Sequence, residues 1–387
     1  MIQIPVEPQL TEYLHRKAAR ARTPLSVSFE LTPVCNMACR MCYVRMDRKT
    51  QESMAPLAPA SQWLELAGQA REHGLLYVLL TGGEPFTHPE FRQILEGLHR
   101  MGFILTVNTN GTLIDEETVE WLKRTPPSRF NVTLYGASDE TYGRLCGKPD
   151  GFTRATRAIR LLREAGMTVK VNISLTPYNA GDLEAMFRWC RENGLIIQAT
   201  SYMFPPLRRD GASTGRNEGR FTPEEAAYWS AKIESQLNGE EAFLKRVEEQ
   251  DLAALSTEPE EFCLPEESGE GDCIRCRAGR CTAWVTWRGQ MNLCGMIPPE
   301  KAVNAFKEGY MAAWKAVVAQ ADAVRLPAAC RECALRDTCR ECAAMVYTET
   351  GGYEQVPEYR CRMAHAYAGQ AARVAEEIRK ARSENGV

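Results

Sequence analysis

Residues 32–42 read TPVCNMACRMC and directly follow a stretch with the alternation of a β-strand. The three cysteines, Cys35, Cys39 and Cys42, have the spacing C-x3-C-x2-C. A loop after a strand lets three sulfur atoms converge on one metal centre, which a straight strand cannot do. Three thiolates are one fewer than the four that normally hold a [4Fe–4S] cluster, so one iron would stay open for a ligand. The spacing therefore predicts a cluster that takes part in chemistry.

The alternative for these cysteines is a structural zinc site or a set of buried thiols. A structural zinc ion takes four Cys or His ligands, but the next histidine after the cysteine run is His73. The spacing therefore favours iron and sulfur over zinc.

The composition of the 387 residues is that of a globular protein with a net charge of −3. This balance does not favour nucleic acid as a partner, which would require a basic surface. No apolar run approaches the roughly 20 residues that cross a bilayer, and no signal peptide begins the sequence. We therefore expect a cytoplasmic protein without a membrane segment. Fifteen cysteines in a reducing compartment indicate metal or redox chemistry.

From residue 25 to about 235, strand-like and helix-like patterns alternate. The expected strands are 26–31, 77–80, 104–107, 131–134, 169–175 and 196–200. Six strands that alternate with helices predict an α/β fold with a parallel sheet and outer helices. Ligands bind at the carboxyl ends of the strands in such sheets. The predicted organisation is an N-terminal helical segment (1–24), a barrel (25–235), an acidic helix and linker (236–262), a cysteine-rich domain (263–362) and a C-terminal helix (363–387).

With these features the sequence resembles the radical S-adenosylmethionine (SAM) enzymes, whose hallmark is this cysteine loop after the first strand of a partial (β/α)6 TIM-type barrel. The resemblance implies that the open iron binds the amino and carboxylate groups of SAM. One electron from the cluster would then cleave SAM to a 5′-deoxyadenosyl radical, which removes a hydrogen atom from the substrate. A flavodoxin- or ferredoxin-type protein would supply the electron.

The second expected strand ends in Thr81-Gly82-Gly83-Glu84-Pro85. On the residues alone this is a tight turn, although glycine permits close backbone approach and a carboxylate can accept hydrogen bonds from an ammonium group. In the resembling family this turn binds the amino group of the methionine moiety of SAM.

The resemblance implies further SAM contacts, whose sequence motifs are less specific. Met41 or Tyr43 would cover the adenine, although the family prefers an aromatic residue at the position of Met41. Asn108 would bind the ribose. The remaining candidates are Thr133, Arg144, Arg154 and Asn172. The alternative for each is turn chemistry or a surface charge.

The C-terminal cysteines resemble the SPASM extension of radical SAM enzymes, which holds two auxiliary [4Fe–4S] clusters. The spacing of Cys330, Cys333, Cys339 and Cys342 departs from the SPASM pattern by one residue, at Cys342. The resemblance implies Cys276, Cys281, Cys294 and Cys342 as ligands of the first auxiliary cluster, with Cys273 as an alternative. It implies Cys330, Cys333, Cys339 and Cys361 for the second. Three [4Fe–4S] clusters are therefore expected, and a pair of zinc ribbons is the alternative.

Cys146 follows the fourth expected strand, so we expect it near the barrel mouth. It could donate a hydrogen atom, as a cysteine does in the peptide epimerases of this superfamily. The alternative is an inert packed thiol.

The leading hypothesis is a maturase that modifies a ribosomally synthesised peptide by a thioether or carbon crosslink or by epimerisation. The alternatives are an anaerobic sulfatase-maturing enzyme, a cofactor-building enzyme of the pyrroloquinoline quinone type, and a non-catalytic iron–sulfur electron carrier. About 24 residues precede the first strand, which is short for a leader-binding domain, so we expect leader capture by a separate leader-peptide-binding protein or by the SPASM surface.

The segment 204–220 follows the sixth expected strand, so we expect it to lie over the barrel mouth and to hold an extended acidic substrate. Its arginines are Arg208, Arg209, Arg216 and Arg220. The alternative is a solvated loop.

Overall fold

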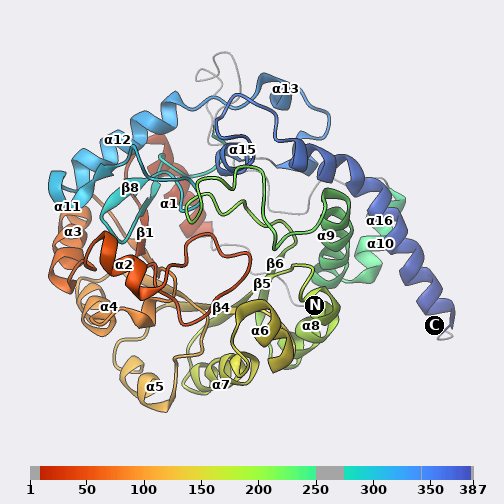
Figure 1. Ribbon diagram of the computed structural model, residues 1–387, viewed down its shortest axis with the longest axis horizontal. Coiled ribbons are helices and arrows are strands. Elements are labelled where there is room, and N and C mark those ends of the chain that lie inside the picture. The colour runs from red at the N-terminus through yellow and green to blue at the C-terminus, as the bar shows by residue number, and fades with distance from the viewer. Residues whose placement is uncertain (1–8, 250–273, 341, 385–387) are drawn as a thin grey trace.

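The structure is a computed structural model that describes residues 9–249, 274–340 and 342–384. Its first half is a barrel of strands surrounded by helices (Figure 1). The strands are β1 (Ser26–Glu30), β2 (Tyr77–Thr81), β3 (Ile104–Thr109), β4 (Arg129–Leu134), β5 (Val169–Ser174) and β6 (Ile196–Thr200). Neighbours from β1 to β6 pair in parallel and in sequence order. The predicted partial (β/α)6 barrel is therefore confirmed.

Helices cover the outside of this barrel because each has one apolar face. In α3, Trp63, Leu66, Ala67 and Ala70 are buried at three- and four-residue spacing. The helices of this half are α1 (Gln9–Arg20), α2 (Arg48–Met54), α3 (Ala60–Glu72), α4 (Phe91–Arg100), α5 (Glu116–Leu122), α6 (Asp139–Cys146), α7 (Gly151–Glu164), α8 (Leu183–Glu192), α9 (Pro223–Asn238) and α10 (Glu240–Glu248). Two short 3-10 helices are η1 (Pro85–Thr87) and η2 (Ala180–Asp182).

The cysteine-rich half continues the sheet of the barrel. Its strands are β7 (Thr282–Val285), β8 (Gln290–Asn292) and β9 (Val303–Asn304). β7 runs parallel to β1, with Ser26 opposite Thr282, and the hairpin of β7, β8 and β9 extends the edge. Within the described residues the strand order is therefore β6-β5-β4-β3-β2-β1-β7-β8-β9 in a single sheet. The predicted boundary at residue 263 lies outside the described residues, and the described strands before and after it belong to one sheet.

Helices of the C-terminal half pack on both ends of the barrel wall. They are α11 (Ala305–Glu308), α12 (Tyr310–Ala323), α13 (Ala328–Arg331), α14 (Arg336–Cys339), α15 (Ala343–Thr350) and α16 (Glu358–Glu384). α12 contacts α3, whereas α16 contacts α9 and α10, so the chain closes into a ring (Figure 1). α16 begins earlier than predicted, which places Cys361 in its first turn. Among the helices described, none is long and apolar enough to cross a membrane.

Candidate active site

The loop that carries Cys35, Cys39 and Cys42 is held against the turn after β2. The Gly83 amide donates to the Thr32 carbonyl at 2.6 Å, and the next amide donates to the Val34 carbonyl at 2.9 Å. A Cβ atom on Gly83 would lie 2.4 Å from the Val34 carbonyl oxygen. The glycine pair, predicted to bind SAM, thus has a second role, because it lets two backbones approach closely.

Glu84, the predicted partner of the SAM ammonium group, is fully buried. Its carboxylate accepts hydrogen bonds from the Thr109 hydroxyl at 2.8 Å, the Asn110 amide at 2.7 Å and the Phe86 amide at 3.3 Å. These bonds tie the end of β2 to the end of β3. A carboxylate offers about four acceptor sites, so one stays available to a ligand. Burial raises the pKa of Glu84 to about 7.

N–H groups point at two of the three loop thiols. The Met37 amide lies 3.4 Å from the Cys35 sulfur, and the Arg45 amide lies 3.4 Å from the Cys42 sulfur. Burial raises the pKa of the Cys35 thiol to about 12, so its thiolate needs a metal cation in place of the proton. Buried sulfurs with N–H donors suit an iron–sulfur cluster, and the residues present therefore fit that group.

Asn110 is a contact of the cysteine loop that was missed from the sequence. Its Nδ2 atom donates to Asn36 Oδ1 at 2.9 Å and lies 3.7 Å from the Cys35 sulfur. Asn108, chosen from the same turn, instead accepts a hydrogen bond from Asn131 Nδ2 at 2.8 Å. The turn Asn108-Thr-Asn-Gly contains two asparagines. The sequence alone does not show which of them contacts the cysteine loop.

The third thiol, Cys39, lies beside Cys146 at the end of α6. The Ala38 amide donates to the Cys146 carbonyl at 2.8 Å, and the Cys146 side chain is fully buried. Contact with Cys146, together with burial, raises the pKa of Cys39, and a hydrogen bond with Tyr135 acts in the opposite direction. The candidate hydrogen-atom donor Cys146 thus packs behind the cysteine loop. Tyr135, which directly follows β4, is aimed at this loop thiol.

Two predicted residues face the barrel lumen from neighbouring strands. Thr133 on β4 and Asn172 on β5 are register partners. Asn172 Oδ1 is buried without a hydrogen-bond partner, which leaves an acceptor for a ligand.

The two arginines suggested for the SAM carboxylate are exposed and bound elsewhere. Arg144 Nη2 donates to the Tyr178 carbonyl at 2.7 Å. Arg154 pairs with Asp150, one turn earlier on α7. Arg154 therefore lies outside the site, because its helix points it along the outer surface.

Met41 and Tyr43, both suggested as adenine contacts, lie in different surroundings. Met41 is buried under Gly219, where a Cβ atom would come within 2.7 Å of Met41 Cβ. The Tyr43 ring centre lies 6.0 Å from the Arg208 guanidinium carbon. Burial raises the pKa of Tyr43, and the Glu30 carboxylate acts in the same direction. Tyr43 therefore lies beside the pair of Arg208 and Glu30.

The segment 204–220 uses Arg208 for its own attachment. Arg208 Nη1 and Nη2 each lie 2.7 Å from a carboxylate oxygen of Glu30, and the two side chains are 7% and 0% exposed. Trp284 Nε1 donates to the same carboxylate at 2.9 Å. This buried bidentate pair joins the segment to β1 and β7, so Arg208 cannot hold a substrate.

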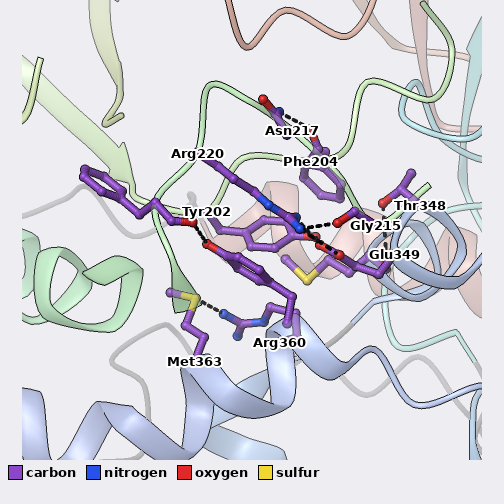
Figure 2. A network of polar contacts seen from close by, with 12 residues as sticks. Tyr202, Phe204, Gly215, Asn217, Arg220, Thr348, Glu349, Arg360 and Met363 are labelled. Carbon is purple, nitrogen blue, oxygen red and sulfur yellow. Dashed lines mark hydrogen bonds and ion pairs between the residues drawn. The ribbon is translucent and has the colours of Figure 1, made fainter. Parts of the chain in front are cut away.

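Arg220 is likewise buried in an ion pair (Figure 2). Its Nη1 atom donates to Glu349 Oε1 at 2.7 Å, and the Tyr202 hydroxyl donates to the same oxygen at 2.7 Å. The guanidinium carbon lies 3.9 Å from the centre of the Tyr359 ring. The expectation that four arginines hold an acidic chain is therefore wrong for Arg208 and Arg220, which anchor the segment to the C-terminal half.

Three thiols suggested for the first auxiliary cluster gather near one another. Cys276 and Cys294 both interact electrostatically with Cys342, and burial raises the pKa of Cys342 to about 12. The Met345 amide lies 3.5 Å from the Cys342 sulfur at the start of α15. This set of three neighbouring thiols fits an iron–sulfur cluster.

The fourth suggested ligand, Cys281, has a different environment. It is fully buried in an apolar cluster with Ala18, Ala19 and Leu25, where α1 meets the start of β1. The alternative, Cys273, lies outside the described residues.

Of the thiols suggested for the second auxiliary cluster, Cys330 lies on α13, Cys339 on α14 and Cys361 in the first turn of α16, and Cys333 lies between α13 and α14. α14 packs against α16, and Arg360 donates to the Cys339 carbonyl. The Leu335 amide lies 3.4 Å from the Cys333 sulfur.

A cavity of about 1220 Å³ occupies the part of the barrel lumen nearer the amino ends of the strands, where Thr11 and His15 of α1 also line it. Ser28, Thr106 and Asn131 line it from the strands, and Cys276 and Cys294 line it from the C-terminal half. A molecule in this cavity would therefore lie beside the first group of auxiliary thiols.

Residues 29–190 match the model of the Radical SAM superfamily. Over 353 residues the chain is 24% identical to the AdoMet-dependent heme synthase of Methanosarcina barkeri, which covers 88% of this chain and 97% of that protein. Over 180 residues it is 29% identical to the antilisterial bacteriocin subtilosin biosynthesis protein AlbA of Bacillus subtilis. That match covers 46% of this chain and only 39% of AlbA.

The fold is similar to that of SuiB from Streptococcus suis bound to its precursor peptide SuiA. The TM-score is 0.66 at 19% identity, over 92% of this chain and 82% of that chain. This likeness concerns the fold alone. The cysteine loop after β1 and the family match together identify residues 29–190 as a Radical SAM superfamily domain.

Proposed function

We propose that this protein uses a [4Fe–4S] cluster on Cys35, Cys39 and Cys42 to start a radical modification of a peptide. The observation that carries the proposal is the position of this loop directly after β1, where backbone hydrogen bonds hold it against the turn that carries the buried Glu84. When bound, the cluster and SAM would supply a 5′-deoxyadenosyl radical that abstracts a hydrogen atom. The chain would supply the three thiolates, one free acceptor site on Glu84, and walls that exclude water.

Similarity to AlbA and the fold of SuiB, which was solved with a precursor peptide, support a peptide as the substrate. The reaction would be a crosslink or an epimerisation. Electrons would come from a flavodoxin or ferredoxin, and a separate protein could deliver the leader peptide. We further propose two auxiliary clusters, with Cys276, Cys294 and Cys342 in the first and Cys330, Cys333, Cys339 and Cys361 in the second. The fourth ligand of the first would be Cys281 or Cys273.

A second candidate function is chemistry on a porphyrin. It is favoured by one observation, the match that covers 97% of the AdoMet-dependent heme synthase. Both candidates share the radical step and differ in the molecule held in the lumen.

The radical step is tested with anaerobically reconstituted protein, dithionite and SAM, with 5′-deoxyadenosine measured by liquid chromatography. We expect product from the wild type and from Cys190→Ala, a buried cysteine on α8 away from the loop, but none from Cys35→Ala. No product from cluster-loaded wild type, or unchanged product from Cys35→Ala, would refute the proposal and favour an electron carrier. Mass change of a peptide encoded beside the gene, against heme formation from an iron-porphyrin precursor, separates the two substrates.

A further inference from the structure

The segment 204–220 meets the first group of auxiliary thiols at one buried guanidinium. Arg208 Nη1 donates to the Gly295 carbonyl at 2.7 Å, and Gly295 directly follows Cys294 in the chain. A Cβ atom on Gly295 would lie 2.6 Å from the Trp284 ring, so this side chain of β7 packs on the same backbone. The Arg208 side chain is only 7% exposed, so water and salt screen its charge little. Arg208 therefore places a fixed cation beside Cys294.

The other end of this ion pair belongs to the strand that leads into the cysteine loop. Glu30 is the last residue of β1, shortly before Cys35. Its carboxylate accepts two bonds from Arg208 at 2.7 Å and one from Trp284 Nε1 at 2.9 Å. These three bonds hold a fully buried group, so the pair cannot turn over without breaking charged hydrogen bonds.

The pair is oriented between the two groups of thiols. Burial raises the pKa of Tyr43, and the Glu30 carboxylate adds to this rise more than the Arg208 guanidinium opposes it. Burial also raises the pKa of the Cys294 thiol, to about 11, and here the Arg208 guanidinium acts against the rise. The carboxylate thus lies toward Tyr43, the residue after Cys42, whereas the guanidinium lies toward Cys294.

An oriented ion pair acts in opposite directions on the charges at its two ends. A cation stabilises the extra negative charge that a cluster gains on reduction, and a carboxylate destabilises it. The reduction potential of an iron–sulfur cluster depends on the charges and hydrogen bonds around its sulfur atoms. The end that carries Arg208 should therefore favour reduction, and the end that carries Glu30 should disfavour it.

We propose that the pair of Glu30 and Arg208 raises the midpoint potential of an auxiliary cluster at Cys294. It thereby favours an electron at this cluster over an electron at the cluster of the cysteine loop. The same pair attaches the segment 204–220 to the sheet, so it has a structural and an electrostatic role. This inference rests on the auxiliary cluster of the proposed function, but it requires no particular substrate.

The test is a redox titration of anaerobically reconstituted, full-length protein, followed by electron paramagnetic resonance. The signal of the first auxiliary cluster is the one that Cys294→Ser removes. We expect Arg208→Gln to lower the equilibrium constant for reduction of this cluster about tenfold, which is a shift of about −59 mV for one electron. Glu30→Gln keeps the cation and removes the carboxylate, so it should shift the potential in the positive direction.

Two further variants separate the charge from the attachment. Arg208→Lys keeps a cation and should keep a potential near that of the wild type. Arg246→Gln breaks a different, largely buried ion pair, with Glu234, between the outer helices α9 and α10, and should leave the potential unchanged. Iron content and circular dichroism verify that each variant is folded and loaded.

Shifts of the same sign in Arg208→Gln and Glu30→Gln, or no shift in either, would overturn the inference, because a purely structural pair has no preferred sign. If Arg208→Gln takes up no iron at this site, Glu30→Gln decides, and the lack of a positive shift overturns the inference. A wild type without a signal that depends on Cys294 would overturn both the inference and the auxiliary cluster. Opposite shifts in a protein that forms no 5′-deoxyadenosine would support the inference and refute the proposed radical function.

Discussion

Among single residues, Glu84 and Tyr135 do most to define the surroundings of the cysteine loop. Glu84 fastens the ends of β2 and β3 through three hydrogen bonds from its own chain. Tyr135 hydrogen-bonds to Cys39 from the end of β4. Both are polar groups in buried surroundings, where each hydrogen bond matters more than it does in water.

Glu84 should make the stability of the metal-free protein depend on pH. Its pKa rises from 4.5 to about 7 on folding, so the folded state holds a proton that the unfolded state has released between these values. Stability should therefore fall as pH rises through this window, by up to about 3 kcal/mol. Thermal unfolding at pH 5 and pH 8 should show a smaller difference for Glu84→Gln than for the wild type. An identical difference would contradict the prediction.

Tyr135→Phe should make the midpoint potential of the loop cluster more negative. The hydrogen bond to Cys39 favours the reduced, more negative cluster, and its loss corresponds to about 20–65 mV for one electron. A redox titration followed by electron paramagnetic resonance measures this shift. Tyr228→Phe, which removes a hydroxyl bonded to Glu377 on the outer helices, is the control. Equal potentials for both variants would argue against the contact.

At the scale of elements, contacts between loops and strands hold the parts of the structure together. Glu30 and Trp284 lie on β1 and β7, and both reach Arg208 in the segment 204–220. The turn after β2 holds the cysteine loop through backbone bonds. These contacts fix where the loop and the segment above it lie relative to the sheet.

Breaking the pair of Glu30 and Arg208 should be costly. Arg208→Met leaves a fully buried carboxylate without its cation, which typically costs about 3–5 kcal/mol. Arg154→Gln removes only an exposed pair and should cost at most about 1 kcal/mol. The apparent melting temperature should therefore drop strongly in the first variant only, and adding Glu30→Gln to Arg208→Met should recover part of the loss. A small effect of Arg208→Met would show that the pair does not anchor the segment.

Gly83→Ala should displace the cysteine loop. The added Cβ atom would meet the Val34 carbonyl oxygen at 2.4 Å, far inside ordinary contact distance, and the backbone cannot yield cheaply. Iron per chain after reconstitution should fall by about four, the content of one cluster. Gly68→Ala on α3, where a Cβ atom meets nothing within 4 Å, should keep its iron. Full iron in Gly83→Ala would mean that the loop tolerates the shift.

On the scale of the whole molecule, the C-terminal half is part of the barrel wall. β7 continues the sheet beside β1, and α16 packs on α9 at the other end. The thiols of Cys276, Cys294 and Cys342 thereby reach the lumen cavity. Any cluster on them would be close to a bound substrate.

Cys294→Ser should remove about four iron atoms per chain and leave the cluster of the cysteine loop in place. Cys190→Ala should remove none. Metal analysis and 5′-deoxyadenosine formation measure the two effects separately. About two zinc ions per chain in the wild type would instead support zinc ribbons.

The sequence by itself determined the barrel, the cysteine loop and the glycine turn, because periodic apolar strands, close cysteine spacing and adjacent glycines are local patterns. Only the tertiary structure decided that Arg208 pairs with Glu30, which is 178 residues away. It also decided that Asn110 and Tyr135 contact the loop thiols and that β7 pairs with β1. It also placed Arg154 on the outer surface and Cys146 behind the loop. These contacts depend on which distant segments pack together in the interior, because an unpaired charge or donor is costly there. Local sequence patterns do not specify that packing.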